Sequence, residues 1–570
     1  MKKNKQAGIK NNAPKPEAIS GKPTPAASGF GSFLSVEEKI CLALMVCLLF
    51  FVVTVRLNFV SIPFERDEGA YSYYGKLLLH GKIPYKDFYE QKYPGIFYFY
   101  AFMIAVFGDT VEGMHKGFIF LNVATIILIF YAARNLFSPI AGIVSATTFA
   151  ILSLTPFLSG FTVQSEHGVA FFTSLGLLFY SLYNTKGKWL YNFLMGVSFG
   201  CAFMVKTSGV FLVLWGGLIL IINFFLDKKR SFKDLLAEIG VYSGGVFVFI
   251  IILFLIIFAK GSFQEMIFWA YEIPKKYVGK VPLEMGMKFF GYTKDAIVKD
   301  HEFFWIHSLL AVVLCLFKSI DYKKKLFGIT LLFFSLCTIV PGFYFYGHYW
   351  IMTLPGLAMA SGLTCYCIIT VLQNGFKIKF KGLKYVYLSI FALFVFSHVS
   401  AYSEYYFDPN YDTILRAVYG NNPFPEAKEI ANYIDKNSKP EDGIVVVGSE
   451  PELYFYTKKN SPSRHAYFSA IVDNVPEHHQ WQREFVSDVE KAKPRYFIFF
   501  NHNLSLLVQP NTDTYVFDWM KVYIDSNYRI AGVVDMIDGQ PSVYKWGASA
   551  LSYRPVSKTL VYIFERRTDR

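Results

Sequence analysis

The chain has 570 residues, of which 53% are hydrophobic and only 17% are charged, and its formal net charge is +13. Soluble domains carry about a quarter charged residues, so this composition excludes an ordinary soluble enzyme. Lys and Arg form no stripe on a soluble face, and nothing therefore favours a nucleic-acid partner.

Residues 1–37 form a tail rich in Pro, Ala, Gly and Lys, which we expect to be disordered and cytoplasmic. Apolar runs of about 18 to 22 residues then recur up to residue 402, and each is long enough to span a bilayer as a helix. Residues 38–402 are therefore predicted to be an α-helical polytopic membrane domain with about eleven spans. The runs lie near residues 39–59, 115–133, 139–157, 168–183, 189–205, 208–226, 238–258, 303–319, 326–342, 350–373 and 384–402.

Basic residues gather in the tail and in alternate loops, such as "NTKGK", "DKKRSFK", "DYKKK" and "KIKFKGLK". The loops at 158–167 and 343–348 contain no Lys or Arg. Because cytoplasmic loops carry the excess of positive charge, we expect a multi-pass protein of the inner (plasma) membrane. Its N-terminus should lie in the cytoplasm and its C-terminus outside.

The first external loop, residues 64–108, is dense in charged and aromatic residues. Asp67 and Glu68 come directly after the first span, and "AYSYYGKLLLHG" has an apolar face at helical spacing. The next apolar stretch, "IFYFYAFMIAVFG", is too short to span comfortably. These patterns predict two interfacial helices that form a shelf over the bundle. A shelf with paired carboxylates and a lysine beside lipid is suited to a lipid-linked phosphate.

Residues 403–570 change in composition and contain no Cys. "EAKEIANYIDK" and "QWQREFVSDVEKAK" have helical periodicity, whereas "GIVVVGS", "RYFIFFN" and "RIAGVVDMI" are short apolar runs typical of strands. The alternation predicts an α/β domain on the outer face. It has no phosphate-loop or dinucleotide fingerprint, so we expect it to act as a lid or an acceptor platform.

The segment "RDEGAYSYYGKLLLHGKIPYKDFYEQKYPGIFYFYAFMIAVFG" resembles the first external loop of the polytopic GT-C glycosyltransferases. It is most similar to bacterial relatives of the protein O-mannosyltransferases and of the lipid A aminoarabinose transferase (glycosyltransferase family 39-like). The family pattern has an acid pair with Gly, a leucine-rich helix, Pro-Tyr, Asp-Phe and a Lys-Pro-Pro-Gly-like turn. Tyr93 stands in place of the first Pro of that turn. "QSEHGVAFF", "GHYWIMTLPGLAMASG" and "VVVGSEPELYFYTKKNSPSRH" are weaker echoes of the same family.

The resemblance implies transfer of a sugar from a polyprenyl-phosphate donor to a lipid, glycan or protein acceptor at the outer face. Such an enzyme needs a base for the acceptor hydroxyl and cations for the phosphate. Inversion by direct displacement needs one carboxylate and no covalent intermediate. The resemblance puts the base at Asp67, with Glu68 orienting it or binding the acceptor, and the donor phosphate at Lys92. The alternatives are that Asp67 and Glu68 only keep an exposed loop hydrated, and that the Lys92 side chain extends to the membrane interface without binding phosphate.

Other candidates for the donor phosphate lie near the outer membrane surface. Tyr349 could hydrogen-bond the phosphate or belong to an aromatic belt. His348, beside it, is a candidate for acceptor or metal binding. Lys206, in "FMVKTSGVF", would require an anion if it is buried, although snorkelling is the alternative.

Glu166 opens a span on the outer side, where it could bind acceptor or metal, or simply favour a helix N-terminus. Glu90 and Glu166 with a His could hold a divalent metal ion, but no ligand spacing fixes such a site. No cofactor follows firmly from the sequence.

Two other classes of function fit the same hydropathy. One is a transporter or flippase of lipid-linked glycans, which would more naturally show charges at mid-membrane and broken helices in matched halves. The other is a glycan polymerase or ligase that uses the same donor. The acids of this chain cluster in external loops, which favours chemistry at the membrane surface.

Overall fold

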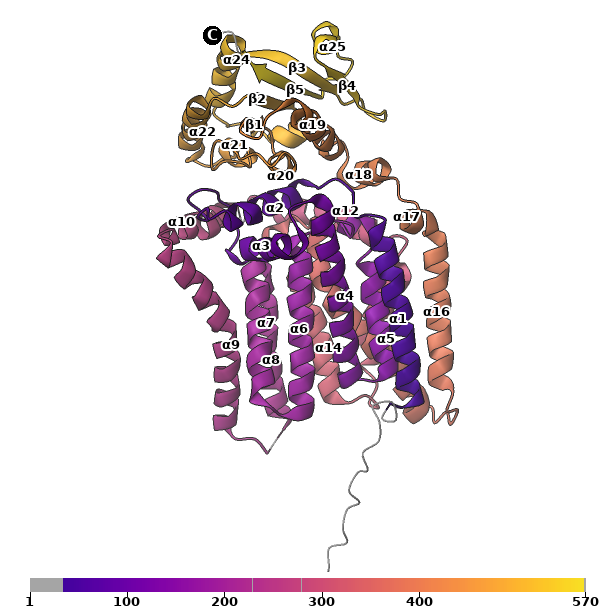
Figure 1. Ribbon diagram of the computed structural model, residues 1–570. Coiled ribbons are helices and arrows are strands. Elements are labelled where there is room, and N and C mark those ends of the chain that lie inside the picture. Colours follow the sequence, from indigo (N-terminus) through magenta and orange to yellow (C-terminus); the bar gives the residue numbers. More distant parts are fainter. Residues whose placement is uncertain (1–33, 228, 278, 568–570) are drawn as a thin grey trace, which may run out of the picture.

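The computed structural model describes residues 34–227, 229–277 and 279–567. The predicted tail, residues 1–37, lies almost wholly outside them. The chain is arranged in three layers: a bundle of long helices, a shelf of shorter helices across one end of it, and an α/β domain above the shelf (Figure 1).

Eleven helices of the described residues overlap the predicted spans one for one. They are α1 (Val36–Leu57), α4 (Val111–Leu136), α5 (Pro139–Leu152), α6 (Ser165–Lys186), α7 (Trp189–Val205), α8 (Val210–Leu226), α9 (Phe232–Ala259), α13 (Glu302–Leu314), α14 (Tyr322–Cys337), α15 (Leu354–Thr370) and α16 (Leu383–Ala401). By length and composition, six helices of the described residues could cross a membrane. The chain is therefore a membrane protein, and the count of eleven spans remains a prediction.

The ends of these helices follow capping rules. α1 begins after Ser35, whose hydroxyl accepts from the Glu38 amide while the Glu38 side chain accepts from the Ser35 amide. α9 begins with the same reciprocal pair at Ser231 and Asp234. Such a capping box satisfies two amide groups that would otherwise lack partners. The predicted basic loops lie at the end of the bundle opposite the α/β domain (Figure 1).

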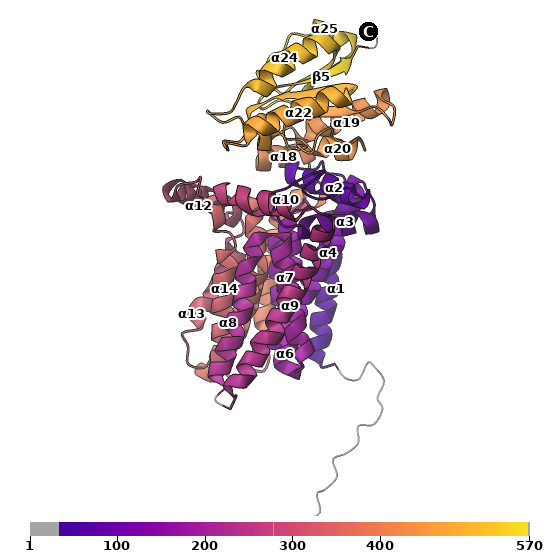
Figure 2. The ribbon, with the colours of Figure 1, turned by 90° about the vertical axis from the view of Figure 1, so that its left-hand side faces the viewer.

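The two predicted interfacial helices are present as α2 (Arg66–Leu79) and α3 (Gly95–Phe107), and both lie across the end of the bundle (Figure 1). The segment 260–301, which lies between two of the predicted spans, forms helices at the same level (Figure 2). These are α10 (Phe263–Ile267), η3 (Phe268–Glu272), α11 (Ile273–Tyr277) and α12 (Leu283–Val298). Short turns η1 (Pro156–Leu158), η2 (Thr207–Gly209), η4 (Pro341–Phe343), η5 (Gly347–Thr353) and η6 (Val371–Gly375) interrupt or extend the bundle helices.

The outer domain follows α16 through α17 (Ser403–Phe407) and α18 (Tyr411–Tyr419). Its five-stranded sheet has the order β1-β2-β5-β3-β4, in which only β1 and β2 are parallel. The strands are β1 (Ile444–Val447), β2 (Tyr496–Asn501), β3 (Tyr528–Asp535), β4 (Val543–Trp546) and β5 (Leu560–Arg566). The helices are α19 (Phe424–Asn437), α20 (Glu452–Tyr456), α21 (Ser469–Val472), α22 (His478–Ala492), α23 (Asn503–Leu506), α24 (Tyr515–Asn527) and α25 (Ala548–Ser552).

Arg66 and Gly69 attach the outer domain to the shelf. The Arg66 guanidinium donates to the Ser449 carbonyl at 2.6 Å and forms an ion pair with Glu450 at 3.1 Å. Gly69 lies against the backbone of Glu452 in α20 so closely that a Cβ atom would overlap it. These contacts hold the first turn of α2 directly beneath the outer domain.

Candidate functional site

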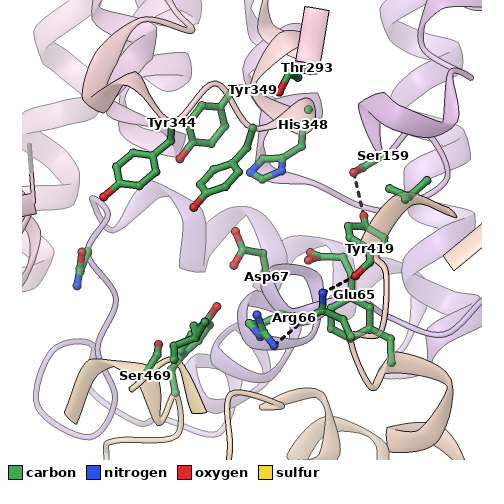
Figure 3. Close-up of a pocket in the computed structure, with 18 of the residues that line it drawn as sticks. Glu65, Arg66, Asp67, Ser159, Thr293, Tyr344, His348, Tyr349, Tyr419 and Ser469 are labelled. Atoms are coloured by element: carbon green, nitrogen blue, oxygen red, sulfur yellow. Dashed lines mark hydrogen bonds between the residues drawn. The ribbon is translucent and has the colours of Figure 1, made fainter. Parts of the chain in front are cut away.

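A cavity of about 1080 Å³ opens between the first turn of α2, the segment 344–349 and the outer domain. Asp67 points into this space between Tyr344 and His348, above it in the view, and Ser469 of the outer domain, below it (Figure 3). The cavity therefore lies where the shelf, the bundle and the outer domain meet.

The start of α2 presents Asp67 to the cavity. Glu65 caps the helix by accepting a hydrogen bond from the Glu68 amide at 2.7 Å, which fixes where the helix begins. Asp67 then lies in the first turn, where carboxylates are favoured by the helix dipole. The Tyr71 hydroxyl, one turn later, donates to Asp67 Oδ2 at 3.1 Å.

Lys92 reaches the same tyrosine from the loop between α2 and α3. Its Nζ hydrogen-bonds to the Tyr71 hydroxyl and lies 4.4 Å from the centre of the Tyr71 ring. It also lies 3.8 Å from Glu90 Oε1. Tyr71 thus connects the candidate base at Asp67 with the candidate phosphate ligand at Lys92.

A close backbone contact brings Lys92 and Lys206 to one end of the bundle. Gly95 begins α3 and packs so tightly on the Met204 carbonyl that a Cβ atom would overlap it. Met204 lies in the last turn of α7, and Lys206 follows the end of that helix. Lys92 and Lys206 are each within three residues of this contact, so it places both cations near the cavity.

Lys206, Glu166, His348 and Tyr349 form one cluster. Lys206 is paired with Glu166, and His348 Nε2 lies 3.7 Å from the same carboxylate. Lys206 Nζ also lies 3.7 Å from the centre of the Tyr349 ring. Lys206 is therefore buried and paired rather than extended to the membrane surface. Of these four residues, His348 and Tyr349 line the cavity.

Glu68 differs from the expectation that it orients Asp67 or binds acceptor. It is fully buried and does not line the cavity. Glu68 Oε1 accepts from the Val163 amide at 3.0 Å and lies 2.9 Å from His115 Nε2, so it joins α2 to α4 and to the segment that precedes α6. Glu65, rather than Glu68, is the other acid near the start of α2 that lines the cavity with Asp67. Sequence reasoning missed Glu65, because Glu is not among the residues that are preferred at N-caps.

Burial changes the acidity of the loop carboxyls. Burial and the neighbouring Asp67 raise the pKa of Glu65 to about 8, and they do the same for Glu90, whose pKa is also about 8. Burial lowers the pKa of Lys92, although Asp67 opposes this effect. Glu65 and Glu90 are therefore mostly protonated at pH 7, which leaves Asp67 among neutral carboxyl neighbours.

A metal ion would need several ligands that the described residues do not bring together. They contain no group of three or more His, Cys, Asp and Glu side chains placed to hold a metal ion. Glu166 is paired with Lys206, and Glu90 lies beside Lys92. The donor set does not fit a metal centre, and no step below uses one.

Comparisons with known proteins agree with this architecture. A family model described as dolichyl-phosphate-mannose-protein mannosyltransferase matches residues 91–258. The crystal structure of ArnT from Cupriavidus metallidurans bound to undecaprenyl phosphate aligns with a TM-score of 0.57 at 12% identity, covering 92% of this chain and 97% of that one. Its apo form aligns with a TM-score of 0.51 at 12% identity and the same coverage.

An oligosaccharyltransferase from Archaeoglobus fulgidus, tethered with an acceptor peptide, aligns with a TM-score of 0.44 at 11% identity over 90% of this chain and 74% of that chain. A comparison with curated proteins finds no match. At this identity the likeness to ArnT shows the fold alone, and the family match covers less than a third of the chain. The chain therefore has the GT-C fold, as ArnT does, and residues 91–258 are similar to the protein mannosyltransferase family.

Proposed function

We propose that this protein is a membrane glycosyltransferase that moves a sugar from a polyprenyl-phosphate donor to an acceptor hydroxyl at the outer face of the plasma membrane. The observation that carries the proposal is the chain of contacts from Asp67 through Tyr71 to Lys92 beside the cavity. It joins a carboxylate base to a phosphate-binding cation on a shelf next to lipid. The family match and the GT-C fold support the same class of reaction.

In the proposed reaction Asp67 takes the proton of the acceptor hydroxyl as the acceptor oxygen attacks the anomeric carbon. The bond between that carbon and the phosphate oxygen breaks, and polyprenyl phosphate leaves with the electron pair. The configuration at the anomeric carbon is inverted, because the displacement is direct and no covalent sugar–enzyme intermediate forms. General bases of this kind contribute about 10² to 10⁴ in rate.

Lys92 and Lys206 would balance the charge that grows on the leaving phosphate. Cations that are already in place stabilise developing charge without a cost of reorganisation. In this structure Glu166 and His348 hold Lys206 near the cavity. When the donor binds, its phosphate would either lie beside Lys206 together with Glu166 or take the place of Glu166 there. The Tyr349 hydroxyl would add a hydrogen bond to the phosphate.

The proposed partners are a polyprenyl-phosphate sugar, a lipid, glycan or protein acceptor, and the surrounding membrane lipids. The experiment uses purified full-length protein in vesicles with a donor labelled in its sugar and its lipid. We expect the sugar label to move to an acceptor while polyprenyl phosphate accumulates. Movement of intact donor between leaflets, with no release of polyprenyl phosphate, would contradict the proposal and favour a transporter.

A further inference from the structure

One part of the cavity wall comes from outside the bundle. The outer domain contributes the segments 467–474 and 507–509, and α12 contributes Tyr292 and Thr293. None of these residues takes part in the reaction proposed above. Their chemistry indicates what the second substrate is.

The apolar part of the cavity lining is aromatic rather than aliphatic. A lipid chain would be matched by Leu, Ile and Val, but among the described lining residues only Val418 and Leu507 are of that kind. Tyrosine rings offer an apolar face and a hydroxyl together, which matches a sugar ring with its C–H faces and hydroxyl edges. The aromatic lining residues are Tyr89, Phe157, Tyr292, Tyr344, Tyr346, Tyr349, Tyr419, Phe424 and Tyr467.

The charges of the lining disfavour a phosphorylated acceptor. Two of the described lining residues are Lys or Arg, and both are paired with acids. Arg66 is bound to Glu450 at 3.1 Å, and Lys280 is bound to Asp473 at 2.9 Å. Asp67 adds a further acid to the lining, whereas Glu65 and Glu90 are mostly protonated at pH 7. A polyanion at this wall would meet carboxylates and would have to break existing ion pairs.

Several uncharged polar side chains of the lining have no hydrogen-bond partner among the described residues. The side chains of Thr293, Tyr467, Ser469 and Asn474 make no hydrogen bond to another described residue. Tyr467 interacts electrostatically with Asp67 and Arg66, so its hydroxyl lies near the candidate base. Hydroxyl and amide groups donate and accept hydrogen bonds alike, as sugar hydroxyls do.

We propose that this wall is an acceptor subsite for a neutral, hydroxyl-rich glycan, bound between the outer domain and α12. The inference rests on the function proposed above and names its second substrate. Pockets for single small ligands measure about 300–1,000 Å³, and the cavity of about 1080 Å³ is larger. The donor sugar and at least one acceptor sugar fit in it together.

The test offers three kinds of acceptor to full-length protein with labelled polyprenyl-phosphate sugars. They are neutral trisaccharides of glucose, mannose and N-acetylglucosamine, a Ser/Thr-rich peptide, and a doubly phosphorylated glucosamine disaccharide. We expect label on a neutral trisaccharide. Release of polyprenyl phosphate with label only on the peptide, on the phosphorylated sugar or on water would overturn this inference and leave the glycosyltransferase function standing. No release with any acceptor would contradict the function itself.

Two variants locate the subsite. Tyr467→Phe removes one hydroxyl and keeps the ring, and Asn474→Ala removes one amide. Because one hydrogen bond contributes about 0.5–1.5 kcal/mol, each should raise the KM for the trisaccharide about twofold to tenfold. The donor KM and the thermal stability should stay as in the unmodified protein. Asn432→Ala, in α19 and outside the lining, is the matched control. Equal acceptor KM values for all four proteins would overturn the assignment.

Discussion

At the residue scale, the site depends on how α2 is rotated. Successive residues of a helix point about 100° apart, and of the two consecutive acids Asp67 and Glu68 only Asp67 lines the cavity. The cap at Glu65 fixes the start of the helix, and it thereby turns Asp67 to the cavity and Glu68 to His115. The sequence could predict that an acid of this motif faces the site. It could not predict which one, because the rotation depends on packing against other segments.

Glu90 gives the site a dependence on pH. Its pKa of about 8 means that it is mostly neutral at pH 7 and becomes an anion as the pH rises through 8. That anion would lie 3.8 Å from Lys92 and compete with the donor phosphate. Donor affinity should therefore fall above pH 8, and Glu90→Gln should weaken this fall. Binding of labelled donor between pH 6 and 9 checks it; identical profiles for both proteins would rule out this role of Glu90.

At the element scale, α2 is held between the bundle and the outer domain. Gly69 allows α20 to contact it directly, and a larger side chain would have to push the outer domain away. Gly69→Val should therefore lower the Tm and expose the junction between shelf and outer domain to protease. Gly240→Ala is the control, because a Cβ atom there meets open space. If Gly69→Val is as stable and as protease-resistant as the control, the close contact does not hold the outer domain.

The same elements show which helices and strands a local sequence pattern can predict and which it cannot. The apolar residues of α2 and α3 form patterns that are visible within each segment, and these patterns predicted both shelf helices. β1, β2 and β3 are apolar runs and were also predicted. β4 and β5 were not, because their place depends on pairing with β3 across the sheet. The helices of 260–301 were not predicted, although the pattern of α12 is amphipathic; the ion pair of Lys280 with Asp473 joins this segment to the outer domain.

At the scale of the whole molecule, the outer domain and the basic loops lie at opposite ends of the bundle (Figure 1). Loop charges then predict that the outer domain lies outside the cell. A reporter that is active only in the cytoplasm, fused after residue 570, should be silent, whereas the same reporter fused before residue 1 should be active. Activity of the C-terminal fusion would mean that the number of spans is even rather than odd.

The central claim is that Asp67 is the base and Lys92 holds the donor phosphate. Donor binding and turnover in purified, folded protein test it most directly. Asp67→Asn should lower kcat by about 10² to 10⁴ with donor affinity nearly unchanged. Lys92→Ala should weaken binding of donor and of free polyprenyl phosphate, and it should also slow turnover.

Glu68→Gln is the matched control next to Asp67. It should lower stability because Glu68 is buried beside His115, yet it should keep most of the turnover. Near-normal turnover of Asp67→Asn, or a larger loss of kcat in Glu68→Gln, would contradict the account.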